Sequence, residues 1–537
     1  MKKRFSIGAL ALVVALAVLP VTELFAATPA DQLIVGMSMN NLLSLDPAAA
    51  TGLDVAMVNA NLYDMLLELD PASPSSMLPS VAESWKVAPD GGSITFVIRK
   101  GIKFQSGNPL TAEDVAWSLR RVLKLNMSLA SAWKVYGFSK DTADASFKAT
   151  DPYTFVVDMP KPTDPKLILF NLGSSPSAFI LDSKKVLENQ VNNDMGNAWL
   201  TTNAAGSGPF KLDDWRAKDA LIMSRFDGYW RAPAKLRRVI LRHMTESQSM
   251  RLMIEKGDID VAYGMTVADI EALKDNKNIS VEAIKKGTLY YVAVSMRDPK
   301  YSNIKVRQAI RLLIDYEGIN KTIMPNYGFF HQRPIQAGLP ATLPDNQGYK
   351  LDVAAAKKLL AEAGYPNGFK TIIHVLSDLP YINIATSLQA TLAQGGIQAD
   401  VISGTGNQVY GYMRERKFEI IVGRGGGGSI PHPDSNLRSM VYNPDNSDAA
   451  KLDNLQGWRT SFYNAEINTL IDKALLEKDE KAQLAMYRRI QDLYEQEAAP
   501  IFTVSQMIDT SVLRGDIENF MTSPSSTTRF REVFKKR

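Results

Sequence analysis

The chain has 537 residues, of which 45% are hydrophobic and 22% are charged, a composition typical of a globular protein with two or three domains. Its 61 basic and 57 acidic residues leave a formal net charge of +4. This near balance speaks against a nucleic-acid-binding protein, in which basic residues gather on one face. The chain contains no cysteine, which excludes a disulfide framework and a lipid anchor on an N-terminal cysteine.

Residues 1–27 have the pattern of a secretory signal peptide. Lys2, Lys3 and Arg4 precede the apolar run IGALALVVALAVLP, and LFAAT then supplies small residues for cleavage after Ala26 or Ala27. A membrane anchor is the alternative, but the run is shorter than the roughly 20 residues that a span needs. Because no lipid anchor is available, we expect an exported protein that is retained in the periplasm.

Strands and helices alternate along the rest of the chain. Strands are predicted at 32–38, 93–104, 151–159, 237–244, 369–376, 397–402 and 418–422, and a turn that leads into a strand at 206–215. Helices are predicted at 111–125, 246–257, 305–319, 351–365, 381–396 and 465–500. Thr111 and Asp114 have capping-box spacing, Gly257 is placed to end a helix and Asp352 to begin one. This alternation predicts an α/β protein with parallel-rich sheets.

Motifs for catalysis and for metal binding are missing. The four histidines lie in no metal-binding motif, and neither a nucleophile elbow nor a P-loop is present. Asp258 and Asp260 are interpreted as turn residues at the end of a helix. We therefore expect no enzyme, no cofactor and no metal. One alternative stays open, a periplasmic hydrolase.

Residues 423–436, GRGGGGSIPHPDSN, are the most unusual stretch. Gly423, Gly425 and Gly428 fit the dinucleotide-binding pattern G-x-G-x-x-G, which must lead directly into a helix. Pro431 and Pro433 follow instead, so we predict no helix here and exclude a nucleotide site. Glycines directly after a strand indicate positive φ or a close approach to backbone.

The segment 77–121, MLPSVAESWKVAPDGGSITFVIRKGIKFQSGNPLTAEDVAWSLRR, resembles the signature of family 5 solute-binding proteins, the extracytoplasmic receptors of ABC importers for peptides, opines and nickel. Segments 206–215, 225–230, 305–319, 354–369 and 464–500 continue the resemblance in order. It implies a type II periplasmic-binding-protein fold with an extra inserted domain, hence three domains in two lobes that close by a hinge. Domain I would comprise 28–70, 203–286 and 505–537, domain II 71–202, and domain III 287–504.

The resemblance also implies a ligand site between domains I and III. The Asp that pairs with a peptide's ammonium in such receptors falls on Gly427 here, and an aromatic position falls on Arg424. Arg424 would then bind an anionic group of the ligand, pair with Asp434 or another carboxylate, or lie on a solvated rim. The candidate ligand-binding residues are Met39, Asn40, Asn41, Arg424, Gly425, Gly426, Gly427, Gly428, Ser429, Asp434 and Asn436.

The expected function is capture of a peptide-like, opine-like or sugar-conjugated solute in the periplasm and its delivery to a membrane permease. The protein is expected to be a monomer that binds no nucleic acid. A chemoreceptor partner or a chaperone on the same fold is a further alternative. Nickel-chelate binding within the same fold is another, because His432 lies beside the implied site.

Overall fold

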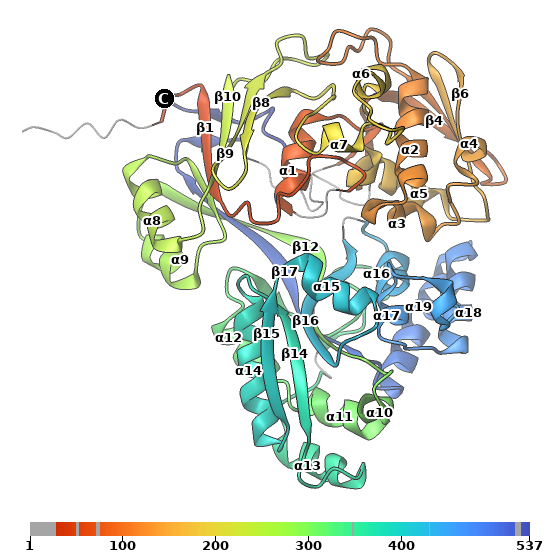
Figure 1. Ribbon diagram of the computed structural model, residues 1–537, viewed down its shortest axis with the longest axis vertical. Helices are drawn as coiled ribbons and strands as arrows, with labels where there is room; N and C mark the ends of the chain where they lie inside the picture. The colour runs from red at the N-terminus through yellow and green to blue at the C-terminus, as the bar shows by residue number, and fades with distance from the viewer. Residues whose placement is uncertain (1–27, 50–52, 71–75, 346–347, 429, 521–527) are drawn as a thin grey trace, which may run out of the picture.

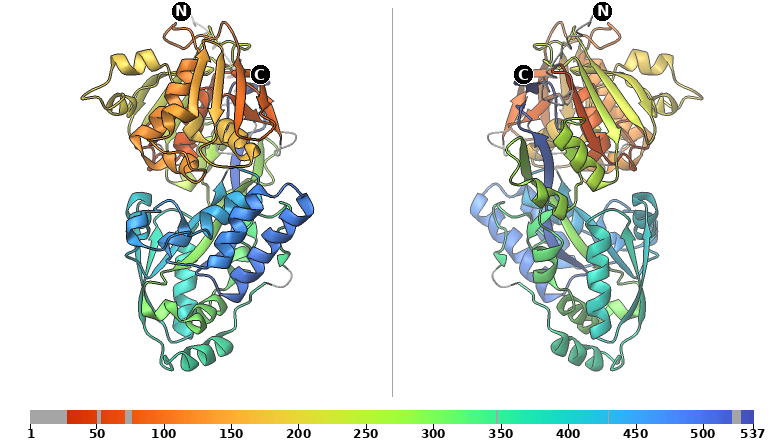
Figure 2. Two further views of the ribbon diagram at one scale, coloured as in Figure 1. Left: turned by 90° about the vertical axis from the view of Figure 1, so that its right-hand side faces the viewer. Right: turned by 90° about the vertical axis from the view of Figure 1, so that its left-hand side faces the viewer.

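The computed structural model describes residues 28–49, 53–70, 76–345, 348–428, 430–520 and 528–537, so the predicted signal peptide lies outside the described residues. The chain forms two lobes (Figure 1). Of the described residues, those within 28–285 and 508–537 form the upper lobe and those within 289–506 form the lower lobe. The side views in Figure 2 show the lobes stacked along the long axis of the molecule.

One large sheet runs through both lobes. Its order is β15-β14-β16-β12-β17-β11-β1-β10-β9-β8, with β13 beside β17. Its strands are β1 (Gln32–Met37), β8 (Phe210–Arg216), β9 (Ala220–Arg225), β10 (Arg238–His243), β11 (Val261–Tyr263), β12 (Ile279–Val294), β13 (Gly328–Phe330), β14 (Lys370–Leu376), β15 (Gln398–Gly404), β16 (Ile420–Gly428) and β17 (Ile501–Arg514). β1 is parallel to β10 and β11, and β14 is parallel to β15 and β16. Every other neighbouring pair is antiparallel. The prediction of parallel-rich sheets was therefore wrong, because hairpins and the long β12–β17 pair add antiparallel neighbours.

β12 and β17 carry the chain between the lobes. They pair from Ile279↔Arg514 in the upper lobe to Ala293↔Ile501 in the lower lobe, and their register shifts between Lys285 and Leu289. The shift lies where the two lobes meet (Figure 1). Such an irregularity weakens a ladder locally, so this crossing is suited to act as a hinge.

The upper lobe contains three hydrophobic clusters. One surrounds β1 and β10, a second lies under an antiparallel sheet of order β4-β5-β7-β6, and a small third one includes Met250, Ile254, Met265 and Ile270. The second core belongs to β4 (Ala82–Val87), β5 (Ser93–Ile98), β6 (Phe147–Asp151), β7 (Thr154–Asp158), α2 (Ala112–Leu125), α3 (Ser131–Lys134), α4 (Ala143–Ser146) and α5 (Pro165–Ser174). The capping box predicted at Thr111 and Asp114 is present at the start of α2.

The other elements of the upper lobe are short. They are α1 (Leu53–Leu62), β2 (Leu67–Leu69), β3 (Met77–Pro79), α6 (Ser183–Glu188), α7 (Asn197–Leu200), α8 (Ser247–Lys256), α9 (Val267–Leu273), β18 (Ile517–Glu518) and β19 (Phe534–Lys535). Gly257 ends α8 with φ 85°, as predicted. Phe179 and Leu200 pack in the core around β1, although their numbers fall in the range expected for domain II. The three domain ranges stay a prediction.

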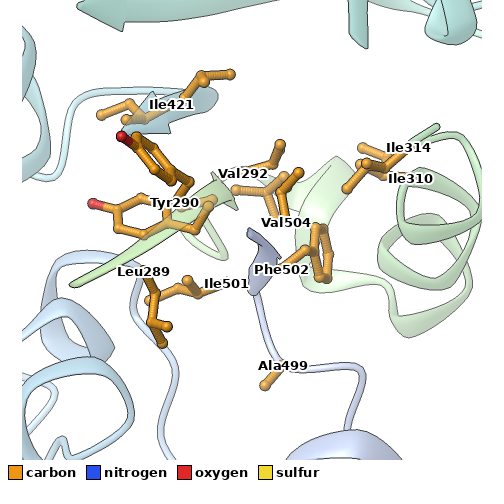
Figure 3. Close-up of a cluster of buried hydrophobic side chains, with 14 of the residues drawn as sticks. Leu289, Tyr290, Val292, Ile310, Ile314, Ile421, Ala499, Ile501, Phe502 and Val504 are labelled. Atoms are coloured by element: carbon orange, nitrogen blue, oxygen red, sulfur yellow. The ribbon is translucent and has the colours of Figure 1, made fainter. Parts of the chain in front are cut away.

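The lower lobe has one core, formed by both faces of β12, β14, β16 and β17 and the helices that cover them. Figure 3 shows Tyr290, Val292, Ile421 and Phe502 among the buried side chains of this core. The helices are α10 (Pro299–Ser302), α11 (Ile304–Leu312), α12 (Tyr316–Thr322), α13 (Val353–Glu362), α14 (Tyr381–Gln394), α15 (Gly406–Arg414), α16 (Pro433–Met440), α17 (Gln456–Arg459), α18 (Ala465–Leu476) and α19 (Glu480–Gln496).

Two predicted helices of the lower lobe are each divided in two. The range 305–319 contains α11 and the start of α12, and the range 465–500 contains α18 and α19. Asp315 caps α12 and Asp479 caps α19, each accepting a backbone N–H through its side chain. Each cap begins a new helix although the apolar pattern continues without interruption. The hydrophobic periodicity alone therefore does not show where the first helix ends and the second begins.

Candidate functional site

The glycine segment (residues 425–428) lies in a strand. β16 runs from Ile420 to Gly428 and pairs with β12 along its length, whereas its pairing with β14 ends at Val422. Beyond Val422 the edge that faces away from β12 has no strand beside it in the described part of the chain. Tyr410 occupies this edge at Arg424: its hydroxyl accepts from the Arg424 N–H at 3.0 Å and lies 3.2 Å from the Arg424 carbonyl oxygen.

A helix does begin shortly after the glycines, contrary to the prediction. α16 starts with Pro433 in its first turn, and the His432 side chain caps it by accepting from the Asp434 N–H at 3.1 Å. Proline is favourable at this one helical position, because its missing N–H would be unpaired there anyway. Gly423, Gly425 and Gly428 belong to β16 and do not form a turn between a strand and a helix. A dinucleotide-binding turn is therefore still excluded, now because of the structure of this segment.

Two of the glycines make room for amide side chains. A Cβ on Gly425 would lie 1.9 Å from Gln456 Nε2, and a Cβ on Gly426, whose φ is +111°, would lie 2.9 Å from Asn436 Nδ2. Both amide side chains are buried. Asn436 Oδ1, Asn436 Nδ2 and Gln456 Oε1 have no hydrogen-bond partner among the described residues. Buried polar atoms are rarely left unpaired, so this wall is suited to bind a polar group.

Arg424 carries the only side chain of β16 beyond Gly423, in the described part of that strand. It is partly buried, and no hydrogen bond or ion pair joins its guanidinium to any described residue. Tyr381, Tyr410, Tyr290 and Asp54 together raise its pKa despite the opposing effect of burial. The Tyr290 and Tyr381 rings lie 5.4 Å apart. Arg424 is therefore positively charged at every physiological pH, and the tyrosine hydroxyl groups act on that charge.

The upper lobe contributes one carboxylate, that of Asp54, which interacts electrostatically with Arg424. Asp54 lies in the first turn of α1 and is buried, and its Oδ1 accepts only the Val55 N–H, at 2.9 Å. Burial raises the pKa of Asp54, while Arg424 lowers it and Asp378 raises it. Asp378 lies between β14 and α14 in the lower lobe. Charges from both lobes therefore act on one another at this place.

Asp434 is not the partner of Arg424. It is fully buried and pairs with Arg438 through two hydrogen bonds of 2.9 Å, and Arg438 also reaches Asp472 at 3.0 Å. Residues four apart lie on one face of a helix, and this spacing gives Asp434 a partner within α16. One alternative for Arg424 is thereby corrected: its charge is not balanced by Asp434.

The other candidate residues lie in two places. Met39 is buried and its N–H donates to His243 Nδ1 at 2.9 Å, while Asn40 and Asn41 are exposed. These three follow β1, where the chain runs along the side of the upper lobe that faces the lower lobe (Figure 1). Gly427 and Gly428 end β16, and Ser429 lies outside the described residues.

Four further residues of this site were not predicted from the sequence: Asp54, Tyr381, Tyr410 and Gln456. Asp54, Tyr381 and Gln456 lie in the first turn of a helix, Tyr410 lies within α15, and none belongs to a motif. Among the described residues, no three His, Asp or Glu side chains are grouped closely enough to hold a metal ion. No described helix has the length and apolar character needed to span a membrane.

Comparisons with known proteins show which proteins the chain resembles. Residues 76–448 match the family described as bacterial extracellular solute-binding proteins, family 5 middle. Heme-binding protein A of Haemophilus influenzae is 25% identical over 496 residues, which cover 88% of this chain and 86% of that protein. Glutathione-binding protein GsiB of Shigella dysenteriae is 26% identical over 535 residues, covering 96% of each.

A solved structure shows the same fold. The periplasmic binding protein DppA from Helicobacter pylori, in complex with the peptide STSA, superposes with a TM-score of 0.80 at 24% identity. The match covers 94% of this chain and 98% of that one. It confirms the predicted type II periplasmic-binding-protein fold.

Proposed function

Because the chain belongs to the bacterial extracellular solute-binding proteins of family 5, we propose that it captures a peptide-like, opine-like or sugar-conjugated solute with an anionic group. Binding a solute and delivering it to an ABC importer is the role of this family. The solute would lie between the two lobes, which close around it by bending at the β12–β17 crossing. Closure requires that the solute bind the closed form more tightly than the open form.

One observation carries this proposal: the guanidinium of Arg424 has no hydrogen-bond or ion-pair partner among the described residues. A guanidinium presents a planar fork that matches a carboxylate or a phosphate with two parallel hydrogen bonds. The glycine segment beside it makes room for the buried amides of Gln456 and Asn436, whose unpaired atoms would bind a polar group of the solute.

The other candidate residues would contribute to solute binding in different ways. Gly425, Gly426, Gly427 and Gly428 would supply backbone N–H groups. Met39, Asn40 and Asn41 would contact the solute from the upper lobe. Asp434 is excluded from direct binding here, because both of its oxygens are engaged by Arg438.

We further infer that the protein is exported to the periplasm through its signal peptide and acts there as a monomer, without enzymatic activity. The nickel-chelate alternative depends on His432, whose Nδ1 accepts the Asp434 N–H. That nitrogen is therefore engaged in capping α16. A peptide-like solute remains better supported than a metal chelate.

The test is a binding measurement on Arg424 variants. Glutathione, the solute in the name of a relative, is the first probe, followed by dipeptides and opine-type conjugates. Removing one member of a buried charge pair costs about 2–5 kcal/mol, which is roughly thirty-fold to several thousand-fold in affinity. We expect Arg424→Ala to lose this much in calorimetry, and Arg424→Lys to recover a part, since lysine has no fork.

Two further variants make the test specific. Gly427→Asp should weaken binding by placing a carboxylate near the solute's anion, and Arg488→Ala, which removes an exposed arginine on α19, should leave affinity unchanged. An affinity change below about twofold in Arg424→Ala would show that the arginine does not hold the solute.

A further inference from the structure

We propose that a second cavity, at the end of β16 away from the glycine segment, binds a phosphate group between Arg297 and Arg416. The cavity has a volume of about 360 Å³, and its walls include Asn446, Ser447 and Ser461 beside the two arginines. It shares no residue with the candidate solute site, so this inference is independent of the proposed function.

The cavity lies within the lower lobe, where β12 ends and β16 begins. Arg297 follows β12, whose Val294 pairs with Ile420 at the start of β16. Arg416 lies in the turn between α15 and β16 and has φ +58°. Arg424 lies further along the same strand. The phosphate would therefore bind near one end of β16, and the solute near the other.

The two arginines of the cavity share a single carboxylate. Asp448 Oδ1 accepts from Arg297 Nη1 and from Arg416 Nη1, each at 2.8 Å, and Asp448 Oδ2 accepts from Arg297 Nη2 at 3.0 Å. The Asp448 side chain is 64% exposed, whereas that of Arg416 is 3% exposed. Two guanidinium groups and one carboxylate leave an excess of one positive charge on the wall. Buried charge is unfavourable unless it is paired, so an anion in this cavity would be stabilised.

The donors of Arg416 favour phosphate over a second carboxylate. Nη1 and Nη2 donate to Asn446 at 3.0 and 2.6 Å, and Nη2 also donates to Ser461 Oγ. The buried Nε has no hydrogen-bond partner among the described residues. A carboxylate has two acceptor oxygens, and Asp448 already uses both on the two arginines. A phosphate group has three acceptor oxygens, so it could replace the contacts of Asp448 and accept a further hydrogen bond from the wall.

Asp448 would then compete with the phosphate for the two arginines. Most of its side chain is in solvent, so an incoming phosphate could displace the carboxylate without burying it. Like charges that remain close together repel one another. The inference therefore predicts opposite effects of two substitutions: loss of an arginine weakens phosphate binding, and loss of the charge of Asp448 strengthens it.

The experiment measures anion binding by calorimetry and by thermal unfolding at constant ionic strength. The probes are inorganic phosphate, ribose 5-phosphate and glutarate, with sodium chloride as the reference. The test variants are Arg297→Ala, which removes a side chain that is 44% exposed, and Asp448→Asn. Arg488→Ala, which removes an exposed arginine on α19, is the control for loss of one positive charge.

We expect phosphate or its ester to bind the unmodified protein and to raise Tm above its value in chloride. Arg297→Ala should lower this affinity about tenfold or more, and Asp448→Asn should raise it about tenfold. Arg488→Ala and Arg424→Ala should bind phosphate like the unmodified protein. Tighter binding of ribose 5-phosphate than of phosphate would identify a phosphorylated organic molecule as the ligand, and equal or weaker binding would identify free phosphate.

Four results would overturn the inference. Neither phosphate nor its ester binds; Arg297→Ala leaves their affinity unchanged; Asp448→Asn weakens their binding, which would show that Asp448 only ties the loop to the arginines; or glutarate binds as tightly as phosphate, which would show a site for carboxylates. If Arg424→Ala abolishes phosphate binding, the anion binds in the candidate solute site, and the inference fails while the proposed function stands.

Discussion

Replacing Asp434 should destabilise the lower lobe without altering which solutes bind. The Asp434–Arg438 pair is almost completely buried, with 0% and 2% of the two side chains exposed, and is joined by two hydrogen bonds of 2.9 Å. Asp434→Ala leaves the Arg438 charge inside the protein with only the half-exposed Asp472 as partner. Breaking such a pair from one side costs about 3–5 kcal/mol.

The expected shift follows from the size of the unit that unfolds. For a domain of about 200 residues, each kcal/mol lowers Tm by roughly 2–4 °C, so Asp434→Ala should lower Tm by about 6–20 °C. Circular dichroism during heating and a urea titration both measure it. The exposed pair Arg489–Glu466, with 47% and 56% exposure, is the control, and Glu466→Ala should cost less than about 1 kcal/mol.

A double variant separates charge from packing. Asp434→Leu combined with Arg438→Met replaces the pair with apolar side chains of similar size, and such replacements are often neutral or stabilising. We expect it to recover most of the lost stability. If Asp434→Ala unfolds like the Glu466→Ala control, or instead lowers solute affinity at unchanged Tm, Asp434 serves the ligand and the reasoning is refuted.

Two further predictions concern the glycine wall and the upper lobe. Gly425→Ala would displace Gln456, whose Nε2 lies 1.9 Å from the added Cβ. This variant should lose about 1–3 kcal/mol of folding stability and should bind solute more weakly in calorimetry. The control is Gly411→Ala on α15, which has open space around it and should be neutral or stabilising. Burial opposes ionisation of Glu68, but Arg529 and Arg531 outweigh it and lower its pKa below the ordinary 4.5. Its stabilising contribution is complete above that pH and is lost on acidification, so Glu68→Gln should flatten the fall in urea midpoint below about pH 4.5; an equally steep fall in the variant would contradict this.

Local rules predicted local structure well. The capping box at Thr111, the cap at Asp352 and the glycine that ends α8 were all confirmed, because each depends on contacts within a few residues. The helix after Pro433 was missed because proline was treated as a breaker, although it is a good first residue of a helix.

Long-range pairing could not be read from the pattern. Asp260 was interpreted as a turn residue, but it is fully buried, lies 2.8 Å from Lys535 and accepts the Ile34 N–H. The candidate site shows the same limit. Arg424 could be identified from the sequence because it is surrounded by glycines. Asp54 and Tyr381 are distant from it in the sequence, and only the folded structure shows that they interact with it.

The pairing of β12 with β17 has a consequence for the engineering of this protein. Lys285 faces Ile508, and Leu289 faces Gln506, so the chain enters and leaves the lower lobe through two hydrogen-bonded neighbours. The lower lobe is therefore a module whose two ends are already adjacent, and domain insertion is tolerated at such sites. A chimera that exchanges residues 289–506 for the same segment of a relative would need only these two junctions, and would transplant one half of the binding surface as a unit.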